Sequence, residues 1–168
     1  MSPLPRLALL PAAAVLAALL AACAFIGAPG GLQPGAPIAQ ARAVFGGPSG
    51  EHALPDGGTR LEFDRGRDTY MLDFDASGRL VTTRQVLNPA TFATIKPGMT
   101  REQVLARIGR PAFVVPVGWQ NLSVWSYRFG GLEGDCIVFQ VSISNATGTV
   151  TETGPNSDPA CSVGGDRS

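Results

Sequence analysis

IKPGMTREQVLARIGRP, at residues 95–111, encodes one short helix with a complete start and a complete stop. Thr100 is a good N-cap, and Gln103 three residues later completes a capping box. Gly109 and Pro111 end the helix, because glycine suits the position after the last turn and proline cannot continue it. The apolar positions between these ends share one helical face: Val104, Leu105 and Ile108. A segment of this kind packs against a core and is seldom catalytic.

This segment resembles the signature of the BamE (SmpA/OmlA) family of outer-membrane assembly lipoproteins. The matching elements are Gly98-Met99-Thr100, Gln103-Val104, Gly109-x-Pro111, the aromatic strand with Trp125, Tyr127 and Phe129, and the hairpin Asn145–Val150. The resemblance runs from Ile95 to Glu152. It implies a protein that binds another protein of the cell envelope, with the beta-barrel assembly machinery as the candidate partner.

A second copy of the pattern lies upstream at a constant offset of 63 residues, where Leu32–Pro48 aligns with Ile95–Pro111. Farther on, Asp75–Leu80 echoes Asn145–Val150 at an offset of 70. We interpret the two copies as an internal duplication, although Gly-x-Pro helix stops are common enough to coincide by chance. The first copy is degraded, since Pro37 occupies the position of the Thr100 cap.

Each copy continues into strands whose apolar residues alternate, which is typical of a sheet with one buried face. In the first copy Leu61 and Phe63 share the buried face, whereas Arg60 and Glu62 are expected on the wet face. The two copies are out of phase at their hairpins, so a bulge or a shifted turn is expected. The predicted fold class is α+β, with two tandem helix-plus-antiparallel-sheet repeats and the helices packed on one face of the sheet. Such tandem repeats resemble the beta-lactamase inhibitor protein, whose concave sheet grips a partner.

The N-terminus predicts export and lipidation. Leu7–Ala22 is an apolar run that is short for a membrane span and fits a signal peptide. Leu20-Ala21-Ala22-Cys23 resembles the bacterial lipobox, which implies acylation of Cys23 and a stable anchor. The alternative is an ordinary signal peptide with a chance cysteine. Because Ala24 follows where an aspartate would resemble an inner-membrane retention signal, the outer membrane is the expected location, with the domain facing the periplasm.

These assignments divide the chain into five parts. We expect a lipoprotein signal peptide at 1–22, the lipidated cysteine and a flexible tether at 23–31, a degenerate BamE-like repeat at 32–87, a BamE-like repeat at 88–153, and a Gly/Pro-rich tail at 154–168.

Two cysteines remain once Cys23 carries lipid, and an even pair in an oxidising compartment predicts a disulfide between Cys136 and Cys161. Such a bridge would hold the tail to the domain and stabilise it by about 3 kcal/mol on a loop-entropy argument. The alternative is two free thiols. No histidine or paired cysteine lies at a spacing that indicates a metal or redox site.

The composition indicates a binding module with no catalytic centre and no cofactor. Thirteen basic and thirteen acidic residues balance without a basic cluster, so nucleic acid is not an expected partner. His52 is the one histidine, and no nucleophile and orienting acid can be placed beside it. Asp73 and Asp75 form a tempting pair of carboxylates, but their spacing favours the wet face of a strand followed by a turn.

Trp119 is the best candidate for a partner-binding residue. A large side chain in a polar loop is either a lid over the core or an interface anchor, and the sequence leaves both open. The favoured hypothesis is a non-catalytic outer-membrane lipoprotein that acts as a protein-binding or scaffold module. The alternative is an inhibitor-like or ligand-binding lipoprotein that uses a concave sheet face.

Overall fold

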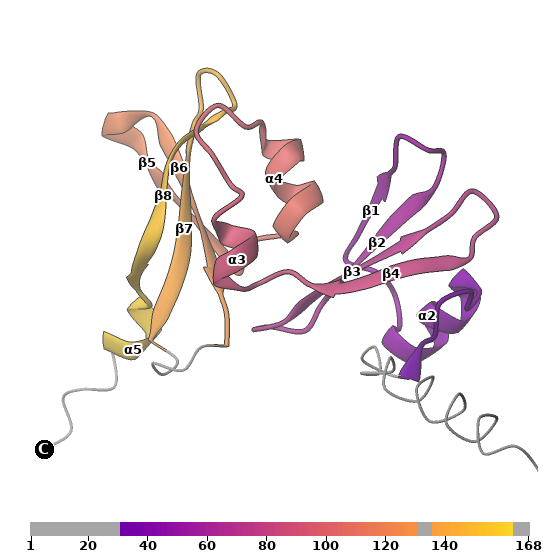
Figure 1. Cartoon of the computed structure of the whole chain (residues 1–168). Coiled ribbons are helices and arrows are strands. Elements are labelled where there is room, and N and C mark those ends of the chain that lie inside the picture. Colours follow the sequence, from indigo (N-terminus) through magenta and orange to yellow (C-terminus); the bar gives the residue numbers. More distant parts are fainter. Residues whose placement is uncertain (1–30, 131–135, 163–168) are drawn as a thin grey trace, which may run out of the picture.

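The computed structural model describes residues 31–130 and 136–162 and contains two four-stranded antiparallel sheets (Figure 1). We call residues 31–87 the first unit and residues 88–162 the second unit. Each unit has a helix of eight residues on one face of its own sheet. The predicted α+β class with tandem helix-plus-sheet repeats is therefore confirmed.

The first unit begins with α2 (Ile38–Phe45). Its sheet has the order β1 (Gly50–Ala53), β2 (Thr59–Asp64), β3 (Thr69–Phe74) and β4 (Leu80–Gln85). The face toward α2, which we call the near face of this sheet, carries the first apolar core. Its buried members are Leu32, Ala41, Phe45, Leu61, Phe63, Leu72, Phe74 and Leu80.

The second unit begins with the short helix α3 (Pro89–Phe92) and α4 (Arg101–Ile108). The sheet follows as β5 (Phe113–Val117), the 3-10 turn η3 (Gly118–Gln120), β6 (Leu122–Arg128), β7 (Ile137–Ser144) and β8 (Val150–Ser157), and α5 (Pro159–Ser162) closes the described chain. The buried core between α3, α4 and the near face of the sheet consists of Leu87, Phe92, Ile95, Val104, Ile108, Tyr127, Phe139, Val141, Ile143 and Val150.

The duplication is visible in the backbone at the offsets read from the sequence. The helix α2 spans 38–45 and α4 spans 101–108, which is 63 positions later at both ends. Isolated bridges join Pro37 to Arg79 and Thr100 to Thr149, so the helix entries are 63 apart and the hairpin partners 70 apart. Register shifts occur at equivalent places in both units, at Asp73/Phe74 and at Ser142/Ile143, so they do not account for the phase difference. The difference lies in the turn, because five residues separate the paired Phe74 and Leu80 and six separate the paired Ile143 and Val150.

The two helix starts differ as expected. The Thr100 hydroxyl accepts a hydrogen bond from Gln103 N, and the Gln103 side chain accepts one from Thr100 N, which completes the capping box. Pro37 makes no side-chain cap. The first copy is therefore the degraded one at this position.

Two expectations are wrong. Gly154–Ser157 were assigned to the tail, but they belong to β8, where Pro155 pairs with Phe139. Because β8 lies at the edge of its sheet, a proline there leaves no ladder partner unsatisfied. In addition, the far face of the first sheet is wet only in part, because Glu62 is only 1% exposed.

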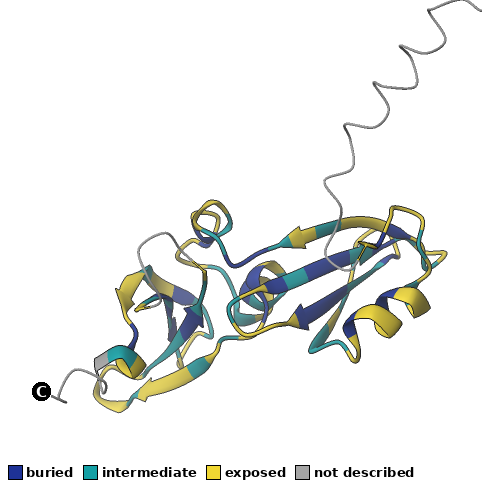
Figure 2. Cartoon of the chain, turned by 90° about the horizontal axis from the view of Figure 1, so that it is seen from below, coloured by how far each residue is buried: buried dark blue, intermediate teal, exposed yellow. Residues whose placement is uncertain are grey.

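The second unit covers that far face. Arg60 Nη1 donates to the carbonyl oxygen of Ala106 in α4 at 2.8 Å, and Arg110 N donates to Glu62 Oε1 at 2.9 Å. The layers therefore run from the second sheet through α4 and the first sheet to α2 (Figure 1). Buried residues follow the strands of both units, whereas many exposed residues lie in the loops (Figure 2). The described strands form two separate sheets, so no concave sheet spans both units.

Candidate functional site

Trp119 lies in η3, the turn between β5 and β6, and its side chain is 85% exposed. It therefore does not cover the core. The turn is fixed by Asn121, which adopts a left-handed conformation. Its backbone carbonyl oxygen accepts a hydrogen bond from Asn145 N at 2.9 Å. Asn145 also accepts a hydrogen bond from the Ser123 hydroxyl at 2.7 Å. An exposed indole on a fixed turn is a preformed contact point.

The strands beside this turn carry further apolar side chains on the far face of the second sheet. Cross-strand pairing places Val115 opposite Val124 and Val117 opposite Leu122, and all four are exposed or half-buried. We call these four residues and Trp119 the hairpin surface. Two of the five exposed large apolar residues of the described chain, Val115 and Trp119, belong to this surface, and a third, Val114, lies on the opposite face of β5. Such concentration is typical of a contact surface.

A second feature is the junction between the units, which is built around Glu62. The Cβ that an alanine would add at Gly109 would lie 2.9 Å from Glu62 Oε1, so glycine is needed for this approach. The Tyr127 hydroxyl donates to the carbonyl oxygen of Gly109 at 3.1 Å. Burial and the nearby carboxylate of Glu62 raise the pKa of Tyr127 well above its usual value. The tyrosine is therefore a neutral donor that holds the end of α4.

His52, the single histidine, lies in β1 at this junction. Its Nε2 atom is 3.6 Å from Glu62 Oε2, and neither buried atom has a hydrogen-bond partner among the described residues. The Ser49 hydroxyl lies near the pair but donates its hydrogen bond to the backbone carbonyl oxygen of Glu62, at 3.2 Å, and the hydrogen bonds of the described residues do not join it to His52. The position is structural in character, since it lies between the two units.

A third feature is a cleft of about 510 Å³ between the first sheet, α3 and α4, lined in part by Arg60, Arg84 and Arg107. Asp73 lies behind it and binds Arg60 through two hydrogen bonds of 2.5 and 2.7 Å and Arg84 through one of 2.9 Å. Burial raises the pKa of Asp73, but the hydrogen bond and charge of Arg60 and the charge of Arg84 outweigh it and leave the pKa below its usual value. Asp73 is thus an ion-pair partner, not the solvent-facing carboxylate expected from its spacing.

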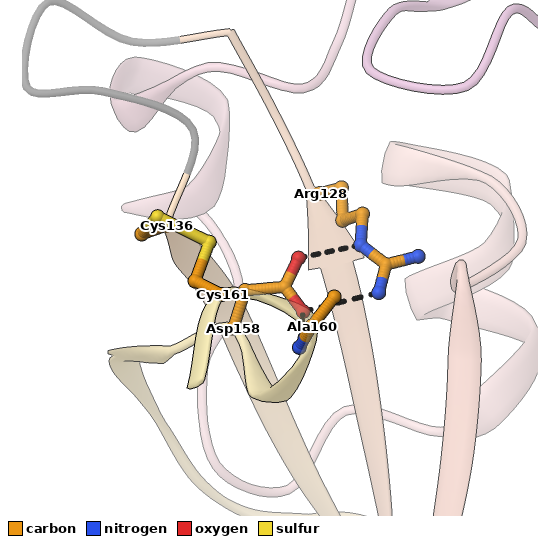
Figure 3. The surroundings of a disulfide bond; sticks show 5 residues. All are labelled: Arg128, Cys136, Asp158, Ala160 and Cys161. Carbon is orange, nitrogen blue, oxygen red and sulfur yellow. Dashed lines mark hydrogen bonds and ion pairs between the residues drawn. A yellow bond between two sulfur atoms is a disulfide. The ribbon is translucent and has the colours of Figure 1, made fainter. Parts of the chain in front are cut away.

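The structure joins Cys136, just before β7, to Cys161 in α5 by a disulfide (Figure 3). The same segment is held by Asp158, whose side chain accepts hydrogen bonds from Arg128 Nε at 2.5 Å, from Arg128 Nη2 at 3.0 Å and from Ala160 N at 3.0 Å. The hydrogen bonding from the Arg128 side chain is the largest cause that lowers the pKa of Asp158, and the bond from Ala160 N adds to it. The resulting pKa is about 2. The end of the described chain is therefore held to the second sheet by a covalent bond and an ion pair.

The predicted lipidation site lies outside the described residues. Cys23 falls in the first 30 residues, which are not described. Within residues 31–130 and 136–162 no cluster of three or more His, Cys, Asp or Glu side chains could hold a metal ion. Over the same ranges no helix has the length and apolar character needed to cross a membrane.

Residues 85–130 match the family model described as "Outer membrane protein assembly factor BamE domain". The match begins at the last residue of β4, includes α3, α4, β5 and β6, and ends two residues after β6. It confirms the BamE resemblance for this segment, which contains Trp119. The first unit up to Arg84, and strands β7 and β8, lie outside it. No curated protein matches the chain.

Three solved structures are similar to the chain at low identity. A "putative beta-lactamase inhibitor protein" from Streptococcus mutans is 10% identical over 71% of this chain and 82% of its own, with a TM-score of 0.34. A DUF4309 family protein from Bacillus subtilis is 14% identical over 71% of this chain and 77% of its own, with a TM-score of 0.29. A cysteine-rich secretory protein from Staphylococcus aureus is 14% identical over 76% of this chain and 47% of its own, also with a TM-score of 0.29. Likenesses of this size carry no argument about function.

Proposed function

We propose that the chain is a lipid-anchored, non-catalytic module that binds another protein of the cell envelope and serves outer-membrane protein assembly. One observation carries this proposal: the segment that matches the BamE assembly-factor domain also bears Trp119 and the rest of the hairpin surface. The partner would be a protein of the outer-membrane assembly apparatus, with the beta-barrel assembly machinery as the candidate.

The hairpin surface has the properties of an anchor for a protein partner. Trp119 offers a large apolar area, and truncating a tryptophan of this kind at a buried interface costs about 2 kcal/mol or more of binding energy. Val115 and Val124 provide an uncharged surface beside it, which is inexpensive to desolvate. Because Asn121 and Asn145 already fix the turn, little conformational freedom remains to be lost on binding.

The anchor in this proposal is the acylated Cys23, after removal of residues 1–22. The segment from residue 23 to residue 31 could reach at most about 28 Å when extended. That length would hold the first unit near the membrane and present the second unit, with the hairpin surface, toward the periplasm. Replacing Cys23 by serine should leave a soluble or unprocessed protein in cell fractionation. Quantitative recovery of mature Cys23→Ser protein with outer membranes would contradict the anchor.

Photo-crosslinking in intact cells tests the protein-binding proposal. A photoreactive phenylalanine derivative is placed at position 119 and, as the matched control, at position 81, since Val81 is also exposed but lies in the first sheet. We expect a discrete protein adduct from position 119 and none, or a different set, from position 81. The identity of the adduct then names the partner. Identical adduct patterns at the two positions, or no protein adduct at 119, would contradict the proposal.

A second measurement separates binding from folding. Trp119→Ala should weaken co-purification of the partner and leave the urea midpoint unchanged, because the side chain packs on nothing in the core. Tyr127→Phe should lower the urea midpoint and leave co-purification of the partner unchanged, because the lost hydroxyl lies inside the junction. Loss of stability in Trp119→Ala would reclassify this residue as part of the fold.

A further inference from the structure

The cleft between the two units carries an excess of positive charge that the fold does not neutralise. Arg60 is fully engaged, since Nε and Nη2 bind Asp73 and Nη1 binds the carbonyl oxygen of Ala106. Asp73 is one carboxylate facing two guanidinium groups, Arg60 and Arg84. None of the ion pairs between described residues includes Arg107, and none of the residues lining the cleft is acidic. Two positive charges therefore remain unbalanced in a chain whose net charge is zero.

The two unbalanced arginines come from different units and line one cleft. Arg84 extends from β4 with about half of its side chain exposed, and one of its nitrogens is bound to Asp73. Arg107 lies in the last turn of α4, where Nη1 donates to the carbonyl oxygen of Thr94 at 3.0 Å. Both side chains thus have fixed positions and further N–H groups for an anion. Guanidinium groups arranged in this way favour the bidentate binding of carboxylates and phosphates.

We propose that this cleft is a second contact site for the protein partner and binds an acidic segment, whose carboxylates pair with Arg84 and Arg107. The inference rests on the proposed function, since it gives the partner a chemical property that the hairpin surface does not specify. The volume of about 510 Å³ exceeds what one small anion fills. The neutral lining from Ala90, Thr91 and Thr94 suits the backbone and side chains of a peptide.

The test is fluorescence anisotropy with the full chain as cells produce it, purified in a non-ionic detergent. The probe is a labelled peptide of six glutamates flanked by Gly-Ser, and its counterpart with six glutamines is the charge control. We expect the glutamate peptide to bind and the glutamine peptide not to bind. Binding should weaken steeply with salt, because exposed charges are screened over about 10 Å at 0.1 M.

Variants locate the site. Arg84→Gln with Arg107→Gln should weaken binding by about tenfold or more, because each removes a charged hydrogen-bond donor. Arg42→Gln removes the same charge from α2, on the other side of the first sheet, and should bind as the wild type does. Trp119→Ala should bind the glutamate peptide as the wild type does. The test of the cleft is therefore independent of the test of the hairpin surface. When the glutamate peptide is added to the wild-type protein, the NMR chemical shifts of the backbone amides should change most around Thr91 and Thr94. This measurement requires no variant.

Three outcomes would overturn the inference. One is the absence of binding by the glutamate peptide at low salt. Another is binding that the double substitution leaves unchanged, or amide shifts that lie away from the cleft. The third is binding of inorganic phosphate, or of anionic phospholipid vesicles, that depends on both arginines while the glutamate peptide does not bind, because the ligand would then be a phosphate group.

Discussion

Glu62 in the first unit, which is only 1% exposed, accepts a hydrogen bond from the backbone N–H of Arg110 in the second unit at 2.9 Å. This bond joins the far face of one sheet to the end of the next unit's helix. Glu62→Leu should lower the free energy of unfolding by about 1–3 kcal/mol, because the Arg110 N–H would lose a charged acceptor.

Glu62→Gln is the matched control for that change. Its oxygen can accept from Arg110 N, and its amide can donate to His52 Nε2, which lies 3.6 Å from Glu62 Oε2. The glutamine variant should therefore equal or exceed the wild type in urea unfolding at pH 8. A leucine variant as stable as the glutamine variant would show that the hydrogen bond does not hold the units together.

Gly109→Ala should be far more damaging than Gly46→Ala, its equivalent in the first copy. Both glycines have φ of 77° with ψ of −153° or −162°, a region nearly restricted to glycine, so each alanine has a backbone cost of about 1–3 kcal/mol. At position 46 the new Cβ meets nothing, whereas at position 109 it meets Glu62 and Thr69 at 2.9–3.0 Å. Overpacking should add about 1–3 kcal/mol there. Equal losses of unfolding free energy in the two variants would show that the close approach at the junction does not contribute to stability.

Thr100→Ala should lower the free energy of unfolding by about 1 kcal/mol, because it removes one half of the capping box of α4. Pro37→Ala, at the equivalent start of α2, should change it less, since Pro37 makes no side-chain cap. Chemical unfolding of the two variants measures both effects. A larger loss at Pro37 would reverse the ranking of the two copies.

Asp158 should make the protein sensitive to acid. Its pKa is about 2 in the folded chain against a usual 3.8, so its contribution is present above pH 3.8 and is lost as the pH falls toward 2. In thermal unfolding with the disulfide intact, Asp158→Asn should be less stable than the wild type at pH 6, and the difference should shrink between pH 4 and pH 2. A difference that stays constant over this range would mean that Arg128 does not stabilise the ionised carboxylate.

The Cys136–Cys161 bond should persist in protein taken from cells and should stabilise the second unit. The bridge closes a loop with a sequence separation of 25, for which chain entropy gives about 3 kcal/mol. Non-reducing mass spectrometry after acid quench should find no alkylatable thiol at either cysteine. Reduction should lower the urea midpoint, and the double Cys→Ala variant should then be insensitive to the reductant.

The sequence predicted those features that depend on local patterns. The cap at Thr100 and the stop at Gly109 follow from residues close to one another in the chain, and the repeat offsets follow from matching two such local patterns. The structure has each of them. Asn88 before Pro89 was a further local signal, an N-cap followed by proline at the first helical position, and it would have predicted α3.

The junction could not be predicted in the same way. Alternation places Glu62 opposite Leu61 and Phe63, and a charged residue at such a position normally faces water. It is buried because a second unit, distant in sequence, covers the face, and no local pattern records that contact. Arg84 and Arg107 are also unremarkable on their own elements, and only the packing of α4 on the first sheet brings them to one cleft.

The junction also defines how a third unit would have to be added. It joins the far face of one sheet to the helix of the next unit, so the two contacting surfaces are different, and repeating the same operation would generate an open filament. In the second sheet the corresponding face presents Gln140, Ser142 and Glu152 along β7 and β8. The hairpin surface lies on the same face, so this face is polar along β7 and β8 and apolar along β5 and β6. The second unit therefore closes over part of the first sheet and offers a chemically different face to whatever binds next.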